Sequence, residues 1–330
     1  MTKADLTSGF FGAKIPGKLT ERDDFTEALV KQLMVLYIFI VVGMILGKWR
    51  RDMAQKSGVL SFLLVNLLLP SKLLLNYTKN FTVAYLQNNY VVIFISLGFL
   101  GLLILSGKLI GKILTREEYA QKVYHYSVTV SNYAFLGYVL MENAFGSEAL
   151  NNMMVFCLPF GLYCYTFGVA LLMDKKVSFK ALCNPTNISI ALGMVFGLTG
   201  IKLPSVISSV ASSASAAVGP ISMLLVGLVL SEFTWKELRP TRQTWVFSVF
   251  RLLVLPAGVF GVCMLLRQFM ELPAAVYPSA VFMAAMPCGL NPVIYPRLIG
   301  KDCSLGAKLI PLTAILSCAT IPLWLYLTQI

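Results

Sequence analysis

Gly43-Met44-Ile45-Leu46-Gly47 returns 150 positions later as Gly193-Met194-Val195-Phe196-Gly197. Each copy lies in an apolar run, and a second apolar run that contains a proline follows each copy. These prolines, Pro70 and Pro220, are also 150 positions apart. The chain therefore divides into two related halves. Such a repeat in a strongly apolar chain is typical of secondary transporters, whose binding sites lie near the middle of the membrane.

The composition predicts an all-α integral membrane protein. Hydrophobic residues make up 57% of the 330 residues, charged residues only 13%, and the mean hydropathy is +0.76. A soluble domain of this length does not need so much apolar surface. Segments of about 17–25 apolar residues can cross a bilayer as helices. Ten such spans are predicted, near residues 28–47, 58–78, 90–113, 119–143, 149–173, 186–201, 205–230, 243–266, 274–298 and 305–328.

The basic residues predict the orientation of these spans. Seventeen lysines and arginines fall in or beside the loops after spans 1, 3, 5, 7 and 9, whereas the loops after spans 2, 4, 6 and 8 hold only Lys79, Lys202 and Arg267. Lysine and arginine concentrate in cytoplasmic loops. Both termini are thus expected outside the cytoplasm, in a multi-pass protein of the plasma membrane. The net charge of +12 is interpreted as a mark of orientation, and no nucleic-acid partner is expected.

Because each half has five spans, the second half is expected to be inverted relative to the first. We expect an extracytoplasmic tail over 1–27, a first five-helix repeat over 28–173, a short cytoplasmic linker over 174–185 and a second repeat over 186–330. The similarity between the halves continues at the ends of spans four and nine. Ala144-Phe145-Gly146-Ser147-Glu148 resembles Leu298-Ile299-Gly300-Lys301-Asp302, at an offset of 154.

Helix-breaking residues concentrate in spans two, four, seven and nine. Pro70, Pro220 and Pro292 are predicted to break their helices, since proline removes a backbone donor and leaves a carbonyl upstream without its partner. At membrane depth such backbone is tolerated only where protein or an aqueous cavity satisfies the freed groups. Ends of half-helices can then bind ions or charged substrates.

At these residues the chain resembles the auxin efflux carrier family of membrane transport proteins. The similarity covers about residues 30–328 and rests on an ordered set of motifs: Asn66 to Pro70, Asn132 to Gly137 with Phe145-Gly146, Asn184-Pro185, Gly219-Pro220 with Leu224 to Gly227, and Met286-Pro287 with Asn291. The resemblance implies two inverted five-helix repeats, as in bile-acid symporters and NhaA-like carriers. Helices 4 and 9 would be broken and would cross near the middle of the membrane. It also implies a scaffold of spans one, two, six and seven, an elevator-type movement of the other six, organic-anion substrates and a homodimer formed through the scaffold.

Two features depart from the family pattern. Tyr138-Val139 stands where the family usually has a proline after the glycine of span four. The loop from Asp174 to Thr186 is short, unlike the long cytoplasmic loop of plant auxin exporters. The short loop favours the microbial permease branch, with malate or malonate permeases as its type.

Asn132 and Asn291 are the first candidates for substrate binding, because they lie at the two expected breaks and carry both donors and acceptors. A helix–helix hydrogen bond without substrate contact is the alternative. Lys72 is interpreted either as a counter-charge for an anion or as a side chain that reaches the outer interface. Arg251 is expected either to pair with a carboxylate substrate or to have a structural role. The remaining candidate binding residues are Ser131, Gly137, Pro287, Cys288, Gly289 and Asn66.

The predicted function is a permease or efflux carrier for a small organic anion such as a carboxylate. The alternatives are a sodium-coupled symporter of the bile-acid type and a receptor built on a transporter fold. An enzyme is not expected, because the sequence has no HExxH, GxSxG or intramembrane aspartate pair. One histidine and seven scattered cysteines favour neither a metal site nor a cofactor. The expected partners are the substrate, the lipid bilayer and a coupling proton or sodium ion.

Overall fold

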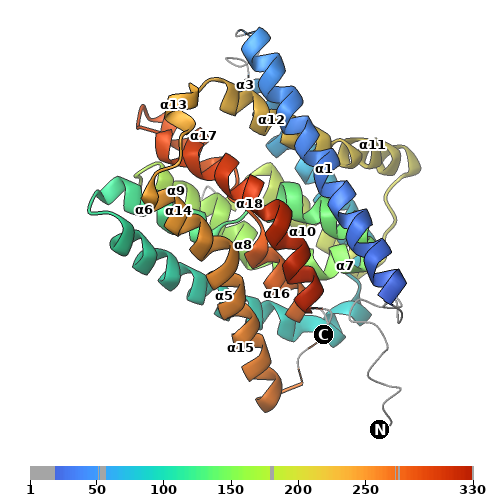
Figure 1. Ribbon diagram of the computed structural model, residues 1–330. Coiled ribbons are helices and arrows are strands. Elements are labelled where there is room, and N and C mark those ends of the chain that lie inside the picture. The colour runs from blue at the N-terminus through green and yellow to red at the C-terminus, as the bar shows by residue number, and fades with distance from the viewer. Residues whose placement is uncertain are drawn as a thin grey trace.

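The computed structural model describes residues 19–50, 52, 57–178, 182–271, 273 and 276–328, and these form a bundle of helices (Figure 1). The first half contains α1 (Leu19–Trp49), α3 (Ser57–Leu63), η1 (Leu64–Leu68), α4 (Leu69–Asn80), α5 (Val83–Leu114), α6 (Glu118–Thr129), η2 (Tyr133–Gly137), α7 (Tyr138–Phe156), α8 (Leu158–Tyr163), η3 (Cys164–Gly168) and α9 (Val169–Leu172). The second half contains α10 (Pro185–Thr199), α11 (Ser205–Ala216), α12 (Val218–Ser231), α13 (Trp235–Leu238), α14 (Arg242–Val249), η5 (Phe250–Val254), α15 (Leu255–Phe269), α16 (Val276–Ala285), α17 (Asn291–Leu298) and α18 (Ser304–Thr328). The segments labelled η are π-helical turns within longer helices.

Six helical segments of the described chain are long and apolar enough to cross a membrane: 30–49, 57–80, 83–114, 205–231, 242–269 and 304–327. A seventh is formed if 145–156 and 158–172, which meet at 52°, count as one span. Two shorter apolar helices, α10 and α16, add to the apolar content. The prediction of an all-helical, multi-span protein is therefore confirmed at this level. α1 begins at Leu19, within the predicted tail, and residues 1–18 lie outside the described part.

The repeated glycines bring helix backbones from the two halves together. A Cβ built on Gly43 of α1 would lie 2.3 Å from the Leu224 carbonyl oxygen of α12. In the second half, a Cβ on Gly193 of α10 would lie 2.9 Å from the Leu74 carbonyl oxygen of α4. Both pairs fit the offset of 150. The first helix of each half thus packs closely on the second helix of the other half.

The same relation holds one turn further along these helices. Gly47 faces Ser231 of α12, whereas Gly197 faces the carbonyl oxygen of Phe81, at the end of α4. The contacts of the two glycine motifs therefore correspond position by position. They show that the sequence repeat is also a repeat of packing.

A left-handed glycine follows the expected fourth span of each half. Gly146 interrupts α7 with φ 83°, and Gly300 follows α17 with φ 67°. Positive φ is unfavourable for side chains with a Cβ, so both turns favour glycine. The similar sequences 144–148 and 298–302 therefore share a backbone feature, a glycine with positive φ.

Two prolines follow π-helical turns, and other side chains satisfy carbonyls upstream of them. Pro70 follows η1, and the Val65 carbonyl accepts a hydrogen bond from Thr186 Oγ1 at 3.2 Å. Pro256 follows η5, and the Leu252 carbonyl accepts one from Trp324 Nε1 at 2.8 Å. Because proline has no N–H, such carbonyls need a substitute donor in an apolar interior. Both helical paths continue past their prolines.

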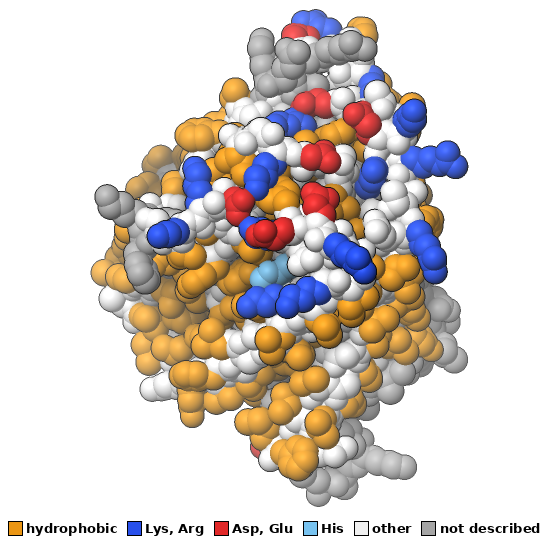
Figure 2. Space-filling model, turned by 90° about the vertical axis from the view of Figure 1, so that its left-hand side faces the viewer, with side chains coloured by type: hydrophobic (Ala, Val, Ile, Leu, Met, Phe, Trp, Pro, Cys, Tyr) orange, Lys and Arg blue, Asp and Glu red, His pale blue; other side chains and the backbone are white. Residues whose placement is uncertain are grey.

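Charged side chains gather at one end of the molecule. Figure 2 shows them in the upper part of the face that carries α5 and α6, above a broad apolar surface. Lys48 Nζ donates to the Phe233 carbonyl at 2.8 Å, and Arg297 pairs with Glu232 at 2.8 Å. Asp174 pairs with both Lys122 and Lys301. These contacts join the loops that the charge pattern assigns to one side. α1 starts and α18 ends at the opposite end (Figure 1).

Candidate functional site

Two helices are interrupted where they meet near the centre of the bundle. The backbone is non-helical at 130–132, between α6 and η2, and at 286–290, between α16 and α17. The two stretches form an antiparallel bridge between Ser131 and Cys288, the single isolated bridge of the described chain. The Asn132 N–H donates to the Pro287 carbonyl at 2.8 Å. The meeting of these two stretches is called the crossing below.

Other groups released by the crossing also find partners. Ser131 Oγ donates to the Met283 carbonyl at 2.9 Å, and the Cys288 N–H donates to Thr313 Oγ1 at 3.1 Å. The Asn132 carbonyl accepts from two amides of η2. No proline stands in the first of the two stretches. Its non-helical backbone pairs with the second stretch through the Ser131–Cys288 bridge and the hydrogen bond from the Asn132 N–H.

Asn132 and Asn291 line the same small cavity beside the crossing. Asn132 is buried, and Asn291 Nδ2 donates to the Tyr126 hydroxyl at 2.5 Å and lies 3.5 Å from Cys164 Sγ. The cavity has a volume of about 30 Å³. That is the space of a single water molecule. An organic anion does not fit here in this conformation.

The other residues predicted around the two asparagines also lie at the crossing. Ser131 and Gly289 line the cavity, and a Cβ on Gly289 would face Asn132 at 3.8 Å. Pro287 and Cys288 contribute the backbone bonds described above. Gly137 lies at the end of η2, where a Cβ would come within 2.9 Å of Met153. Gly137 therefore allows close packing behind the crossing.

Arg251 is the most deeply buried charged side chain near the crossing. It lies in η5 and is 1% exposed, and its Nε and Nη1 atoms have no hydrogen-bond partner in the described structure. Its guanidinium lies close enough to Cys288 for electrostatic interaction. Ser127 Oγ, on α6, is also buried and lies beside Cys288. Burial of a charged group whose Nε and Nη1 atoms lack acceptors is costly, which makes Arg251 a candidate for interaction with an anion.

Lys72 lies in a different cavity from the two asparagines. It is 3% exposed and forms an ion pair with Glu142 of α7. Pro220 and Gln32 line the same cavity, whose volume is about 370 Å³. The pair joins α4, which packs on α10, to α7, which leads away from the crossing. Lys72 thus lines a cavity, as a counter-charge for an anion would, but Glu142 already pairs with its charge.

Asn66 and Pro292 complete the predicted set. Asn66 Nδ2 donates to the Phe62 carbonyl of its own helix at 2.8 Å, away from the crossing. Pro292 occupies the first turn of α17, where a missing N–H leaves no bond broken within the helix. Pro220 follows the junction of α11 and α12 at Ala217.

Several residues of the site were not predicted from the sequence. Tyr126 and Cys164 line the cavity and contact Asn291, and Thr313 holds the Cys288 amide. A tyrosine or threonine in an apolar run carries no signal of its own. Their positions depend on how α6, η3 and α18 pack. His125 of α6 is also buried, with 8% of its surface exposed.

The apolar helices define a multi-pass membrane protein, in which two helices are interrupted where they meet. The sequence profile of the family described as membrane transport protein matches residues 28–176 and 169–325. These two stretches cover most of the chain, which therefore belongs to the membrane transport protein family, the family of the auxin efflux carriers. Membership makes it a membrane transport protein. No match is found among curated proteins.

Proposed function

We propose that the protein is a secondary carrier that moves a small organic anion, such as a carboxylate, by alternating access. The observation that best supports this is the crossing, with Asn132 and Asn291 on a shared cavity and the unpartnered Arg251 close to Cys288. The asparagines offer amide donors to a carboxylate, and the guanidinium offers the counter-charge. We assign substrate binding to these three residues, with Ser131, Cys288 and Gly289 as neighbours that supply backbone groups.

We further propose ten spans in two inverted repeats. The six long apolar helices and the bent 145–172 pair account for seven, and α10, the α6–η2–α7 path and the α16–α17 path supply the other three. The reciprocal packing of α1 on α12 and of α10 on α4 supports a two-fold relation between the halves, and an odd number of spans in each half would make that relation an inverted one. The charged loops at one end would be cytoplasmic, and both termini would lie outside at the plasma membrane.

An elevator-type movement fits this arrangement. Helices α1, α4, α10 and α12 approach one another through glycines at backbone distance, which favours a rigid scaffold. The crossing belongs to the remaining helices. Because the cavity at Asn132 and Asn291 holds only about 30 Å³, the substrate site must open when these helices move. The short linker at 174–185 makes a microbial permease of malate or malonate type the favoured branch.

Transport in proteoliposomes tests the proposal. Labelled malate, malonate and indole-3-acetate would be offered with and without imposed proton and sodium gradients. We expect saturable flux of one anion, and the gradient response identifies the coupling ion or its absence. No flux of any anion by folded protein would contradict the carboxylate assignment and favour a receptor.

Arg251→Met tests the counter-charge in the same assay. We expect flux to fall at least tenfold while the melting temperature is kept or raised, because removal of an unpaired buried charge does not destabilise. Arg242→Met is the matched control, since Arg242 lies exposed on the preceding helix α14. Equal flux in the two variants would exclude Arg251 from anion recognition.

A further inference from the structure

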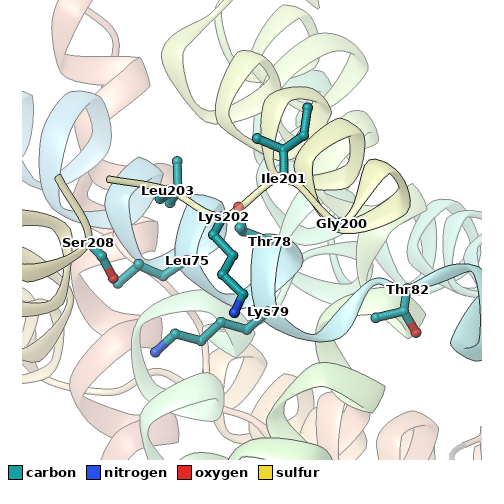
Figure 3. A pocket seen from close by; sticks show the side chains of 10 residues that line it. Leu75, Thr78, Lys79, Thr82, Gly200, Ile201, Lys202, Leu203 and Ser208 are labelled. Atoms are coloured by element: carbon teal, nitrogen blue, oxygen red, sulfur yellow. The ribbon is translucent and has the colours of Figure 1, made fainter. Parts of the chain in front are cut away.

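A third cavity lies at the end of the molecule that has few basic residues. It has a volume of about 450 Å³ and lies between the end of α4, the connection from α10 to α11 and the start of α11. Lys79 and Lys202 both line it. Figure 3 shows the two lysine side chains side by side, with Thr78 and Ser208 around them. This cavity is distinct from the crossing and from the cavity of Lys72.

Basic residues are scarce at this end of the protein, so two lysines in one cavity are unexpected. The loops after the even-numbered spans hold three basic residues, and two of them line this one cavity. Neither lysine has an ion pair or hydrogen bond within the described part of the chain. Thr78 Oγ1, which belongs to the lining, is also buried without a partner. Two like charges in one cavity repel each other unless an anion lies between them.

The backbone around the cavity supports an anion in the same place. Gly200 has φ 71° and turns the chain back after α10, which brings Lys202 beside the end of α4. The next helix, α11, has twelve residues and no side-chain cap on its first amides. Free amides at a helix N-terminus favour negative charge. Ser208, in the first turn after those amides, lines the cavity.

The surroundings of the cavity are apolar, which favours a lipid over a soluble anion. Leu75, Ile201 and Leu203 form part of the lining. Ile201 is 56% exposed, and beyond it Val206 and Val210 of α11 are 72% and 65% exposed. Exposed aliphatic side chains on a membrane-spanning segment face acyl chains. A ligand that fits both parts has a phosphate at one end and hydrocarbon at the other.

We propose that Lys79 and Lys202 bind the phosphate group of an anionic phospholipid in the leaflet at this end of the protein. The lipid headgroup occupies the cavity, with Thr78 and Ser208 as hydrogen-bond donors, and its acyl chains lie along α11. This site does not depend on the transport proposed for the crossing.

Binding of phosphatidylglycerol to the delipidated, full-length protein in detergent tests the site. Thermal stabilisation would be titrated with short-chain phosphatidylglycerol, with phosphatidylcholine of equal chain length and with inorganic phosphate. We expect phosphatidylglycerol to bind about tenfold more tightly than phosphatidylcholine, and inorganic phosphate alone to give no stabilisation at the same concentrations. Each of Lys79→Gln and Lys202→Gln should weaken phosphatidylglycerol binding about fivefold.

Arg267→Gln is the matched control, because it removes one positive charge from the same end but Arg267 does not line the cavity. It should leave phosphatidylglycerol binding unchanged. Equal weakening by Arg267→Gln and Lys202→Gln would reduce the effect to general surface charge and overturn the site. Equal binding of the two lipids would also overturn it, and stabilisation by inorganic phosphate alone would replace the lipid with a soluble anion. Melting temperatures without ligand show whether each variant is folded.

Discussion

At the scale of single residues, the crossing depends on hydrogen bonds made by its two asparagines. The Asn291 side-chain amide donates a hydrogen bond to the Tyr126 hydroxyl, and the Asn132 backbone N–H donates one to the Pro287 carbonyl. The backbone N–H and carbonyl of Asn132 are hydrogen-bonded within the protein, whereas its side-chain amide can bind a ligand. Substitutions at the two positions should affect function more than folding.

Asn291→Ala tests this at one residue. We expect transport to fall at least tenfold while the melting temperature falls only slightly, since one side-chain hydrogen bond contributes about 1 kcal/mol. Asn66→Ala is the control, because its amide bonds its own helix away from the crossing. Flux and melting temperature would be measured for both variants. Parallel loss of expression and transport in Asn291→Ala would make Asn291 a structural residue.

The ion pair of Lys72 and Glu142 gives a second residue-scale prediction. Glu142→Gln leaves a charge that is 4% exposed without its partner, whereas Lys72→Met removes that charge. We expect Glu142→Gln to destabilise by roughly 1–3 kcal/mol, less than for a fully buried pair because Glu142 is 42% exposed. Lys72→Met should cost less, and thermal unfolding in detergent compares them. A larger loss in Lys72→Met would show that the lysine stabilises through contacts other than this pair.

At the scale of helices, glycines set the distance between the two halves. A Cβ on Gly227 would lie 2.0 Å from the Ile40 carbonyl oxygen, and one on Gly197 would lie 2.5 Å from that of Tyr77. Both contacts are with backbone, which cannot rotate away as a side chain can. The helix pairs α1–α12 and α4–α10 would have to separate to accept any other residue.

Gly227→Ala and Gly197→Ala should therefore each destabilise the protein by at least about 1–3 kcal/mol, the usual cost of overpacking. Gly101→Ala in α5 should be neutral or slightly stabilising, since nothing lies within 4 Å of the new Cβ and alanine favours helix. Melting temperatures of the three variants in one detergent test this. Similar values for all three would show that α1 and α12 can move apart freely.

At the scale of the whole molecule, the loops at the charged end are joined around Asp174. Its carboxylate accepts hydrogen bonds from Lys122 at 2.7 Å and from Lys301 at 2.5 Å. The hydrogen bond from Lys122 is the main cause that lowers the pKa of Asp174 from its usual 3.8 to about 2. A lowered pKa means that the folded protein holds the ionised form more firmly than the unfolded chain does.

Because folding lowers the pKa of Asp174, its contribution to stability depends on pH in a defined direction. The contribution of Asp174 to stability should be complete above about pH 5 and should fall as the pH drops through 3.8 toward 2. The difference in melting temperature between the natural protein and Asp174→Asn should thus be constant from pH 7 to 5 and shrink below pH 4. A difference that grows on acidification would contradict the ion-pair assignment.

The sequence predicted the parts of this structure that depend on local composition or on repetition. Apolar runs predicted the helices, and the motifs at Gly43 and Gly193 predicted two related halves that indeed pack through those glycines. The basic residues predicted which loops gather at one end. Asn132 and Asn291 were found because polar groups are rare in such runs, and the structure places both on one cavity.

What the sequence could not supply were contacts between distant helices. Nothing near Arg251 in the sequence indicates that Cys288 will be its neighbour, and nothing near Lys72 indicates Glu142. Lys79 and Lys202 were counted as outer charges, but only the turn at Gly200 brings them together. Such contacts depend on helix packing, which single-sequence patterns do not specify.

The reciprocal packing of the halves has a consequence for biosynthesis. The face of α1 that carries Gly43 and Gly47 packs on α12, and α4 packs on α10, so each half of the chain packs these helices on the other half. Chains usually fold domain by domain as they are made, N-terminal part first. Here we expect the first half to remain incompletely packed in the bilayer until the second half has been synthesised. We therefore expect the two halves to fold as one unit, so that a substitution that disrupts either half should lower the cellular amount of the whole protein.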